Sequence, residues 1–429
     1  MTSNSILTAE DLFKFIEKVW RYMRSITGDG VRLTLKDAKD LIPELEIYEI
    51  PTGTKIWDWT VPKEWIFRSA KILNSRGGVV LDSDDNNLHV LNYSEPVNKK
   101  LKLEALQKHL FSLPEYPSAI PYRTSYYERN WGFCIQHEAR KKLLPDDYQV
   151  TIDSEFIDGS MTFGQVYIPG KVKNEILFST YICHPMMANN ELSGPAIALG
   201  LSSYLKSLNN YYSYRILFYP ETIGSLYFLS RNLEHLQRNL IAGYVLTCLG
   251  DELTWNFMPS RTGITLADKI AKRVLERLKI KYTHNSFLMR GSDERQYCSP
   301  NIDLPVCSVM RSKYGSYPEY HTSKDNLNFI STNGLHESLY FYTKIIDEFE
   351  SNRIPKLKIY GEPMLSRRNL RKTLGGGELS SDENLISNVI AYSDGHHDLT
   401  EMSKLFETSV NSISEIVKLL EKHKIIACL

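Results

Sequence analysis

A histidine and a carboxylate follow an apolar run near the middle of the chain. The run Ile176 to Ile182 has the composition of a buried strand, and His184 comes directly after it. Glu191 lies in the next polar turn, and Ser193-Gly194 then opens a helical pattern. Ligands of open α/β sheets bind in the crevice beyond the carboxyl ends of the strands. Since imidazole and carboxylate groups bind hydrolytic zinc, this spacing predicts a metal site, with a purely structural strand end as the alternative.

A second carboxylate is expected at the same edge of the sheet. The apolar run Tyr214 to Tyr219 ends just before Glu221, and a helical pattern follows. A buried carboxyl group in such a crevice has the raised pKa that suits a general base. The alternative is a glutamate that stabilises the start of the next helix through its dipole.

Two later segments supply further candidates. The turn from Arg290 to Tyr297 contains Asp293, which is the second candidate for the catalytic base. Its neighbours Arg290, Arg295 and Tyr297 are candidates for binding substrate, although ion pairs of purely structural value remain open for the charged ones. Further on, His321 lies in a run of aromatic and polar residues and is the best second histidine ligand. Asp325 is a candidate to orient the ring of this histidine.

Four segments, CHPMMANNELSGP, PETIGS, RGSDERQYCSP and YPEYHTS followed by DNL, give the chain a family resemblance. It resembles the M28-type zinc aminopeptidases, and more closely the DUF4910/DUF2172 family of aminopeptidase-like proteins with a small insert domain and a C-terminal winged helix. The resemblance covers nearly the whole chain. It implies a zinc-dependent hydrolase of a peptide or amide bond, with His184, Glu191 and His321 on the metal and Glu221 as general base.

Several positions depart from the M28 pattern, in which they are carboxylates: Met186, Asn190, Thr222 and Thr247. An amide oxygen is a poorer ligand than a carboxylate and does not bridge two cations well. One zinc is therefore expected rather than two, and the choice between Asn190 and Glu191 as a ligand stays open. A catalytically degenerate fold that binds without cutting, as a binding or regulatory protein, is the alternative function.

Composition excludes several classes of protein. The 429 residues contain 51 Lys plus Arg and 51 Asp plus Glu, so no overall basic field attracts nucleic acid or an anionic membrane. No apolar run approaches the roughly 20 residues of a membrane-spanning helix, and the first residues lack the apolar core of a signal peptide. The six cysteines are scattered without metal or disulfide spacing, which favours a cytoplasmic protein with reduced thiols.

The order of predicted elements gives the fold class, α/β with a mainly parallel sheet flanked by helices. Residues 1–40 and 126–364 are expected to form the aminopeptidase-like domain, and residues 41–125 a β-rich insert domain. Residues 378–429 are expected to form a winged-helix domain after a Gly-rich linker. The strands of the main domain are expected at Tyr148–Ile152, Phe163–Ile168, Ile176–Ile182, Tyr214–Tyr219, Ile241–Leu249 and Leu304–Met310.

The C-terminal residues carry their own functional question. From Ser381 to Leu429 there are eight Asp or Glu against four Lys or Arg. Because DNA binding depends on neutralising phosphates, this balance disfavours a nucleic-acid partner. A homo-oligomer contact through this domain is the preferred role, and a DNA-binding regulator is the competing one.

Overall fold

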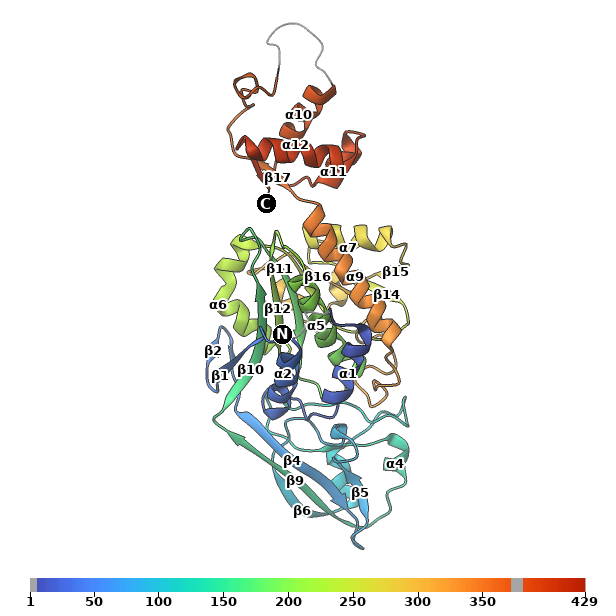
Figure 1. Ribbon diagram of the computed structural model, residues 1–429. Coiled ribbons are helices and arrows are strands. Elements are labelled where there is room, and N and C mark those ends of the chain that lie inside the picture. Colours follow the sequence, from blue (N-terminus) through green and yellow to red (C-terminus); the bar gives the residue numbers. More distant parts are fainter. Residues whose placement is uncertain (1–5, 372–380, 429) are drawn as a thin grey trace. The chain divides into compact units, whose positions relative to one another are not determined.

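The computed structural model describes residues 6–371 and 381–428 of the chain. These residues form two compact units, one up to Lys344 and one from Ile345 onward. The first unit holds a large mixed sheet and a smaller antiparallel sheet, and the second is mainly helical (Figure 1). The glycine run at 375–377, expected to form a linker, lies outside the described residues.

The large sheet has eight strands in the order β1-β10-β12-β11-β13-β16-β14-β15. Its four central strands are parallel: β12 (Ser213–Tyr219), β11 (Glu175–Tyr181), β13 (Leu240–Val245) and β16 (Val306–Met310). Every residue of β11 is buried, which is the pattern of a parallel strand covered on both faces. The marginal strands are β1 (Glu46–Pro51), β10 (Ser160–Ile168), β14 (Trp255–Met258) and β15 (Tyr282–His284). The predicted α/β class, with a mainly parallel sheet, is confirmed.

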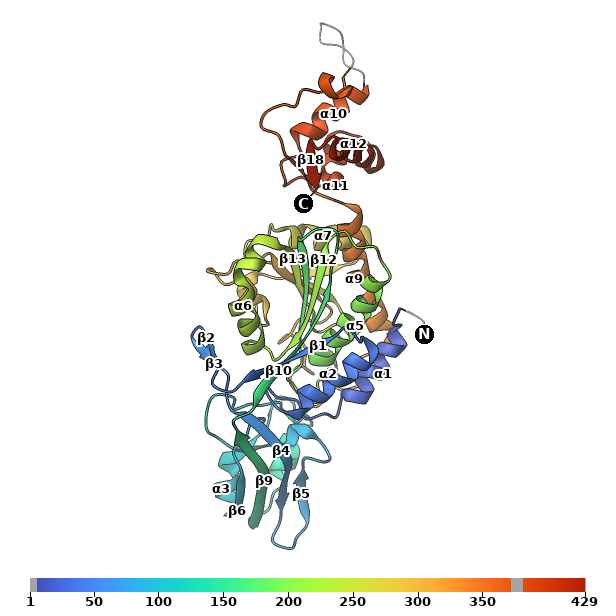
Figure 2. The same cartoon turned by 60° about the vertical axis from the view of Figure 1, so that its left-hand side comes forward.

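Helices cover both faces of this sheet. Helix α6 (Ile223–Asn239) lies on one face, and α5 (Ser193–Lys206), α1 (Ala9–Val19) and α9 (Thr332–Ser351) lie on the other (Figure 2). The remaining helices of this unit that have at least four residues are α2 (Asp29–Leu41), α3 (Leu103–Leu106), α4 (His137–Lys141), α7 (Leu266–Arg277) and α8 (Glu294–Tyr297).

The smaller sheet is antiparallel and lies between β1 and β10 in the chain. Its order is β5-β4-β9-β6, with β5 at Val79–Asp82, β4 at Glu64–Leu73, β9 at Asp147–Ile157 and β6 at Val97–Lys102. The strand expected at Tyr148–Ile152 therefore belongs to this sheet and not to the large one. Alternate residues of β9 are buried, as in an antiparallel strand with one covered face. The β-rich unit thus extends beyond residue 125, because β9 belongs to its sheet.

Two pairs of very short strands complete the first unit. The hairpin of β2 (Lys55–Ile56) and β3 (Trp59–Thr60) follows β1. The parallel pair β7 (Leu110–Phe111) and β8 (Phe133–Cys134) lies between β6 and β9 in the sequence.

The second unit combines three helices with one strand pair. The helices are α10 (Ser381–Ala391), α11 (Leu399–Leu405) and α12 (Val410–Lys422). Strand β17 (Pro355–Leu357) pairs antiparallel with β18 (Ile426–Cys428). This unit therefore includes residues well before position 378, because its last strand needs β17 as a partner.

Two further observations concern the chain's environment. All six cysteines are free and buried. Within residues 6–371 and 381–428, none of the helices has the length and apolar character needed to cross a membrane.

Candidate active site

The site lies where β11 and β12 end. These neighbouring parallel strands are in register at Tyr181 and Tyr219, so their next residues emerge at the same sheet edge. His184 follows β11, and Glu221 follows β12. Thr222 then adopts a positive φ of 67°, which is uncommon for a β-branched residue. This sharp turn separates Glu221 from the start of α6.

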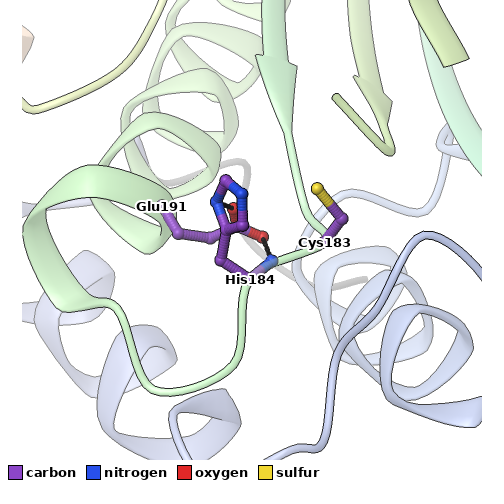
Figure 3. A group of neighbouring side chains, drawn as sticks. All are labelled: Cys183, His184 and Glu191. Carbon is purple, nitrogen blue, oxygen red and sulfur yellow. Dashed lines mark hydrogen bonds and ion pairs between the residues drawn. The ribbon is translucent and has the colours of Figure 1, made fainter. Parts of the chain in front are cut away.

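Glu191 holds the imidazole of His184 in place. It belongs to the single π-helical turn Ala188–Leu192. Its Oε1 accepts a 2.9 Å hydrogen bond from the backbone N–H of His184, and its Oε2 lies 2.8 Å from Nδ1 of that ring (Figure 3). The other ring nitrogen, Nε2, lies 3.7 Å from Oε2 of Glu221. Burial and the nearby Arg24 lower the pKa of His184 to about 3, so this imidazole is neutral at physiological pH.

A fully buried arginine supports this pair. The Nε of Arg24 lies 3.8 Å from Oε1 of Glu191 and donates a 3.0 Å hydrogen bond to the carbonyl oxygen of His184. Burial lowers the pKa of Arg24 to about 10, which leaves it charged at neutral pH. Burial also raises the pKa of Glu191 well above its usual value, and the positive charge of Arg24 opposes that rise. The buried charges of Arg24 and Glu191 therefore compensate each other.

His321 meets Asn190 rather than a carboxylate. Its Nε2 lies 3.1 Å from Oδ1 of Asn190. The Nδ2 of Asn190 donates a 2.8 Å hydrogen bond to the Tyr181 hydroxyl, which lies 2.6 Å from Oγ1 of Thr247. The Thr247 hydroxyl in turn donates a 2.9 Å hydrogen bond to the backbone oxygen of Asn190. Asn190 and Thr247, which the family resemblance places where carboxylates would bind metal, thus form a closed network of neutral groups with Tyr181.

The rings of the two histidines are near each other. Their centroids are 5.1 Å apart, and the ring of Tyr122 packs edge-on at 4.9 Å from His184 and 5.1 Å from His321. Burial lowers the pKa of His321 well below its usual value. Within the described residues, the carboxylate of Asp325 makes no hydrogen bond to this ring. It accepts hydrogen bonds from the backbone N–H groups of Asn189 and Asn190, at 2.6 and 2.9 Å, and so holds the π-helical turn.

Glu221 and Asp293 form an interacting pair of carboxyl groups. Burial is the main cause that raises the pKa of Glu221 well above its usual value, and the charge of Asp293 adds to it. Burial also raises the pKa of Asp293 to about 6, although its Oδ1 accepts 2.9 Å hydrogen bonds from Thr222 N–H and Ser225 Oγ. Arg295 lowers both pKa values and donates a 2.7 Å hydrogen bond to Thr222 Oγ1. Such a pair can hold and release a proton near neutral pH.

His184 and Glu221 line a cavity of about 280 Å³. The Glu221 side chain is 21% exposed, compared with 5% for His184. The cavity is lined by polar residues of the site and by apolar and aromatic residues from the first unit: Cys183, His184, Glu221, Thr222, Arg295 and Gln296, with Ile26, Trp59, Tyr126 and Tyr127.

Two residues expected to bind substrate are placed elsewhere. Arg290 is exposed and its guanidinium stacks at 5.0 Å on the ring of Phe287. Tyr297 is fully buried, and its hydroxyl lies 2.5 Å from that of Tyr219 and donates to Ser179 Oγ at 3.1 Å. Neither lines the cavity. Arg295, the third residue expected to bind substrate, does line it.

The donor groups can be compared with the needs of zinc. Within the described chain, one set of three potential ligands has its donor atoms within 4.8 Å of one another: Cys183, His184 and Glu191. The charge of Glu191 is already compensated by Arg24, so a further cation on that side of His184 would meet a buried positive charge. The opposite side suits a cation better, because Nε2 of a neutral imidazole faces Glu221, and His321 adds a second neutral imidazole nearby. Histidine imidazoles are ligands of catalytic zinc, so His184 and His321 are the candidate ligands, and the carboxylate of Glu221 faces the same space. A second cation does not fit beside Asn190 and Thr247, because both side chains are neutral and form hydrogen bonds with Tyr181.

Several residues of the site carried no sequence signal of their own. Arg24 lies in a turn after α1, and Tyr122 and Tyr126 lie in the segment that returns from the insert domain. All three are far from the histidine motifs in sequence and reach them only through the tertiary fold. Cys183 was visible beside His184, but a lone cysteine gives no role.

Known proteins resemble this chain in sequence and in fold. The model of a family described as a domain of unknown function, DUF4910, matches residues 13–352, and a winged helix-turn-helix model matches residues 353–428. A protein of Clostridium acetobutylicum, provisionally described as a polysaccharide biosynthesis protein with an aminopeptidase-like domain, is 44% identical over 402 residues, which cover 93% of this chain and 92% of the relative.

Solved structures extend the comparison to the fold. A crystal structure from Clostridium acetobutylicum, provisionally described as a peptidase, has a TM-score of 0.83 at 40% identity, covering 98% of this chain and 96% of that one. A zinc aminopeptidase from Bacillus subtilis has a TM-score of 0.60 at 10% identity, covering 80% of this chain and 96% of that one. The second likeness shows the aminopeptidase fold alone.

Proposed function

Because the chain belongs to the DUF4910 family and has the fold of zinc aminopeptidases, we propose that it is a metal-dependent hydrolase of an amide or peptide bond. The observation that carries this proposal is the meeting of two groups at one cavity. The neutral imidazole of His184 and the carboxyl group of Glu221 lie at the carboxyl ends of β11 and β12 and line this cavity, and the buried carboxyl group of Asp293 interacts with that of Glu221.

Each residue has a role in this proposal. His184 and His321 hold a single zinc ion, and Glu191 fixes the ring of His184 through its Nδ1 side. When bound, the ion polarises the scissile carbonyl and lowers the pKa of water. Glu221 takes a proton from the attacking water on its Oε2 and passes it to the leaving nitrogen. Asp293 keeps the pKa of Glu221 high through its charge, and Arg295 limits that rise.

The surroundings of the site support a small soluble substrate. The cavity of about 280 Å³ has aromatic walls and one guanidinium group, that of Arg295, among its lining residues. A relative described as a polysaccharide biosynthesis protein directs attention to amides attached to sugars as well as to peptides. A cytoplasmic location is part of the proposal, and the six free, buried cysteines support it.

A second function is favoured by one specific observation. Asn190 and Thr247, at two positions that the family resemblance gives to carboxylates, form a neutral hydrogen-bonded network with Tyr181. A protein that has lost one metal site in this way can retain the substrate-binding cavity without turnover. In that case the chain binds an amide-containing ligand and acts as a binding or regulatory protein.

The test combines metal content with activity. We expect about one zinc per chain by elemental analysis and hydrolysis of some member of a panel of aminoacyl amides. Glu221→Gln preserves the size of the side chain but removes its basicity, so turnover should fall by roughly a hundredfold or more while zinc content is kept. Glu234→Gln, on the exposed surface of α6, is the matched control and should behave like the wild type.

The outcomes separate the two functions. Zinc binding without hydrolysis of any amide favours the binding protein. Undiminished activity of Glu221→Gln would move the base to another group. Unchanged zinc in the double variant His184→Ala, His321→Ala would refute the metal site proposed for these histidines.

A further inference from the structure

Trp57 combines backbone strain with exposure. It lies at the tip of the hairpin formed by β2 and β3, and its φ is 49°, in the left-handed region that favours glycine. Its side chain is 50% exposed, so the protein core does not require it. The preceding residue, Ile56, is fully buried and already anchors the hairpin. A bulky residue kept in a strained and exposed position points to a role in binding.

The indole of Trp57 lines a cavity of about 460 Å³. This volume falls in the range of small-molecule sites, about 300–1,000 Å³. The hairpin contributes Trp57, Asp58 and Trp59, and α6 adds an aliphatic wall of Leu226 and Leu233. Figure 2 shows the hairpin beside α6.

Another part of the lining of this cavity is polar. It consists of Gln296, Ser299 and Asn301, which come from the same segment as Ile302. Within the part of the chain that the structure describes, the side chains of these three polar residues make no hydrogen bond. Their amide and hydroxyl groups can therefore both donate to and accept from a ligand.

This cavity adjoins the proposed active site. Trp59 and Gln296 line both it and the cavity that contains His184 and Glu221. The ring of Trp59 also packs edge-on against Tyr127, 5.3 Å between centroids, and Tyr127 lines the reactive cavity. The two cavities therefore meet at these shared residues.

We infer that the cavity of Trp57 binds the sugar ring of a substrate whose amide group enters the reactive cavity. A pyranose ring has an apolar C–H face and a rim of hydroxyl groups. The tryptophan rings match the face, and Gln296, Ser299 and Asn301 match the rim. Among the described residues that line the cavity, Asp58 alone is charged, and its negative charge disfavours a phosphate or another anionic ligand.

The inference rests on the proposed function for the position of the amide, and it names the substrate class as an N-acylated amino sugar. Hydrolysis breaks the C–N bond of its amide. Water supplies the hydroxyl to the acyl carbon and the proton to the nitrogen, so the products are a carboxylic acid and the free amino sugar.

The test separates sugar binding from turnover. It uses full-length protein carrying Glu221→Gln, with N-acetylglucosamine and N-acetylgalactosamine as probes and alanyl-alanine amide as the peptide comparison. Binding is measured by saturation-transfer NMR and calorimetry. Trp57→Gly removes the indole and relieves the positive φ, so the melting temperature should hold or rise while the Kd for the sugar rises about fivefold to tenfold.

The matched control is Lys279→Gly. Lys279 follows α7, is exposed and has a φ of 54°, so glycine gives the same backbone relief away from the cavity. We expect unchanged sugar binding in this variant. The inference is overturned if neither sugar binds at tens of millimolar, if Trp57→Gly binds the sugar like its parent, or if only the peptide amide depends on Trp57.

The result is distinguishable from failure of the proposed function. Sugar binding together with no hydrolysis by the wild type leaves the saccharide site standing and refutes the enzyme. Hydrolysis of aminoacyl amides with no sugar binding leaves the enzyme standing and refutes the saccharide site.

Discussion

At the scale of single residues, we propose that Asn190 limits the site to one cation. Its amide oxygen lies 3.1 Å from Nε2 of His321, and its amide nitrogen donates a hydrogen bond to the Tyr181 hydroxyl. An aspartate has no donor, so it would keep the second contact only if the Tyr181 hydroxyl turned from Thr247 to donate to it. The neutral side chain therefore satisfies a buried network that needs both a donor and an acceptor. This explains in physical terms why a carboxylate is not required there unless a second cation is bound.

Asn190→Asp should make stability depend on zinc. In metal-free protein the new buried carboxylate lacks the donor contact to Tyr181, which should destabilise the fold by about 1–3 kcal/mol. Added zinc should restore the loss, because the carboxylate then lies beside His321 with a cation to bind. Thermal melting in EDTA and in zinc measures both effects.

Asn189→Asp is the neighbouring control. Its Nδ2 donates a 2.7 Å hydrogen bond to Asp251, so the substitution opposes two carboxylates away from the histidines. It should lose stability without recovery in zinc. Equal recovery of the two variants, or none in Asn190→Asp, would contradict the explanation of the network.

Asp293→Asn should stabilise metal-free protein at neutral pH. The folded-state pKa of about 6 exceeds the usual value of 3.8, so the folded state binds the proton more tightly between these two pH values. Stability is therefore lost as the pH rises through this window, and the full loss remains above pH 6. Asparagine removes the charge and keeps an oxygen for Thr222 N–H and Ser225 Oγ.

The expected gain for Asp293→Asn is about 2 °C or more in melting temperature at pH 7.5, and it should vanish near pH 4. Asp158→Asn, on an exposed side chain, should show no such pH-dependent gain. A gain that is constant with pH would rule out ionisation of Asp293 as its cause.

At the scale of elements, the pairing of β17 with β18 sets where the C-terminal unit begins. The backbone N–H of Leu399 bonds to the oxygen of Arg353 at 3.2 Å, and the N–H of Thr400 bonds to Asn352 Oδ1 at 2.9 Å. These contacts join the segment before β17 to the start of α11. The boundary expected at residue 378 would leave β17 behind without its partner.

A pair of truncations tests this boundary. A chain that ends at Asn352 keeps α9 whole and should retain zinc and a cooperative thermal transition. A chain that ends at Gly377 keeps β17 with an unpaired edge, so it should aggregate more readily. Sedimentation velocity compares the two truncated chains with the full-length protein. An assembly with fewer subunits for the Asn352 chain alone would also support oligomerisation through the C-terminal unit. Identical behaviour of both truncations would contradict a structural role for β17.

At the scale of the whole molecule, the charge of the C-terminal unit depends on its true extent. Residues 381–429 contain eight acidic and four basic residues, but residues 353–428 contain ten acidic and eleven basic ones. The basic residues between positions 353 and 372 therefore offset the acidic excess. A nearly neutral unit still offers little net attraction to phosphates.

Duplex DNA should bind full-length protein no more tightly than the chain that ends at Asn352. Fluorescence anisotropy with a short duplex, at 50 and 200 mM salt, measures this. A gain in affinity that requires residues 353–429 and weakens steeply with salt would establish the DNA-binding alternative.

The sequence by itself determined the parts of this protein that depend on local pattern. Apolar runs predicted the central strands, and His184, Glu221 and His321 were visible because each lies in a polar motif beside such a run or among aromatic residues. The family followed from long motifs in a fixed order, and the α/β class followed from the alternation of strand and helix patterns. The winged helix was implied by the family resemblance and fitted the helical patterns at the C-terminus. The comparisons confirm all three.

Only the tertiary structure decided how those motifs meet. The strand at Tyr148–Ile152 has an apolar pattern that suits either sheet, and its antiparallel partner β4 placed it in the smaller one. Tyr297 looked like a site residue in its motif, yet the packing of α8 buried it away from the cavity. Arg24 and Tyr122 reach the histidines from distant segments, and the balance of buried charge around Glu191 depends on the first of them. Such contacts between distant segments arise from the packing of whole elements, because neither spacing nor residue type along the chain records which side chains share a desolvated space.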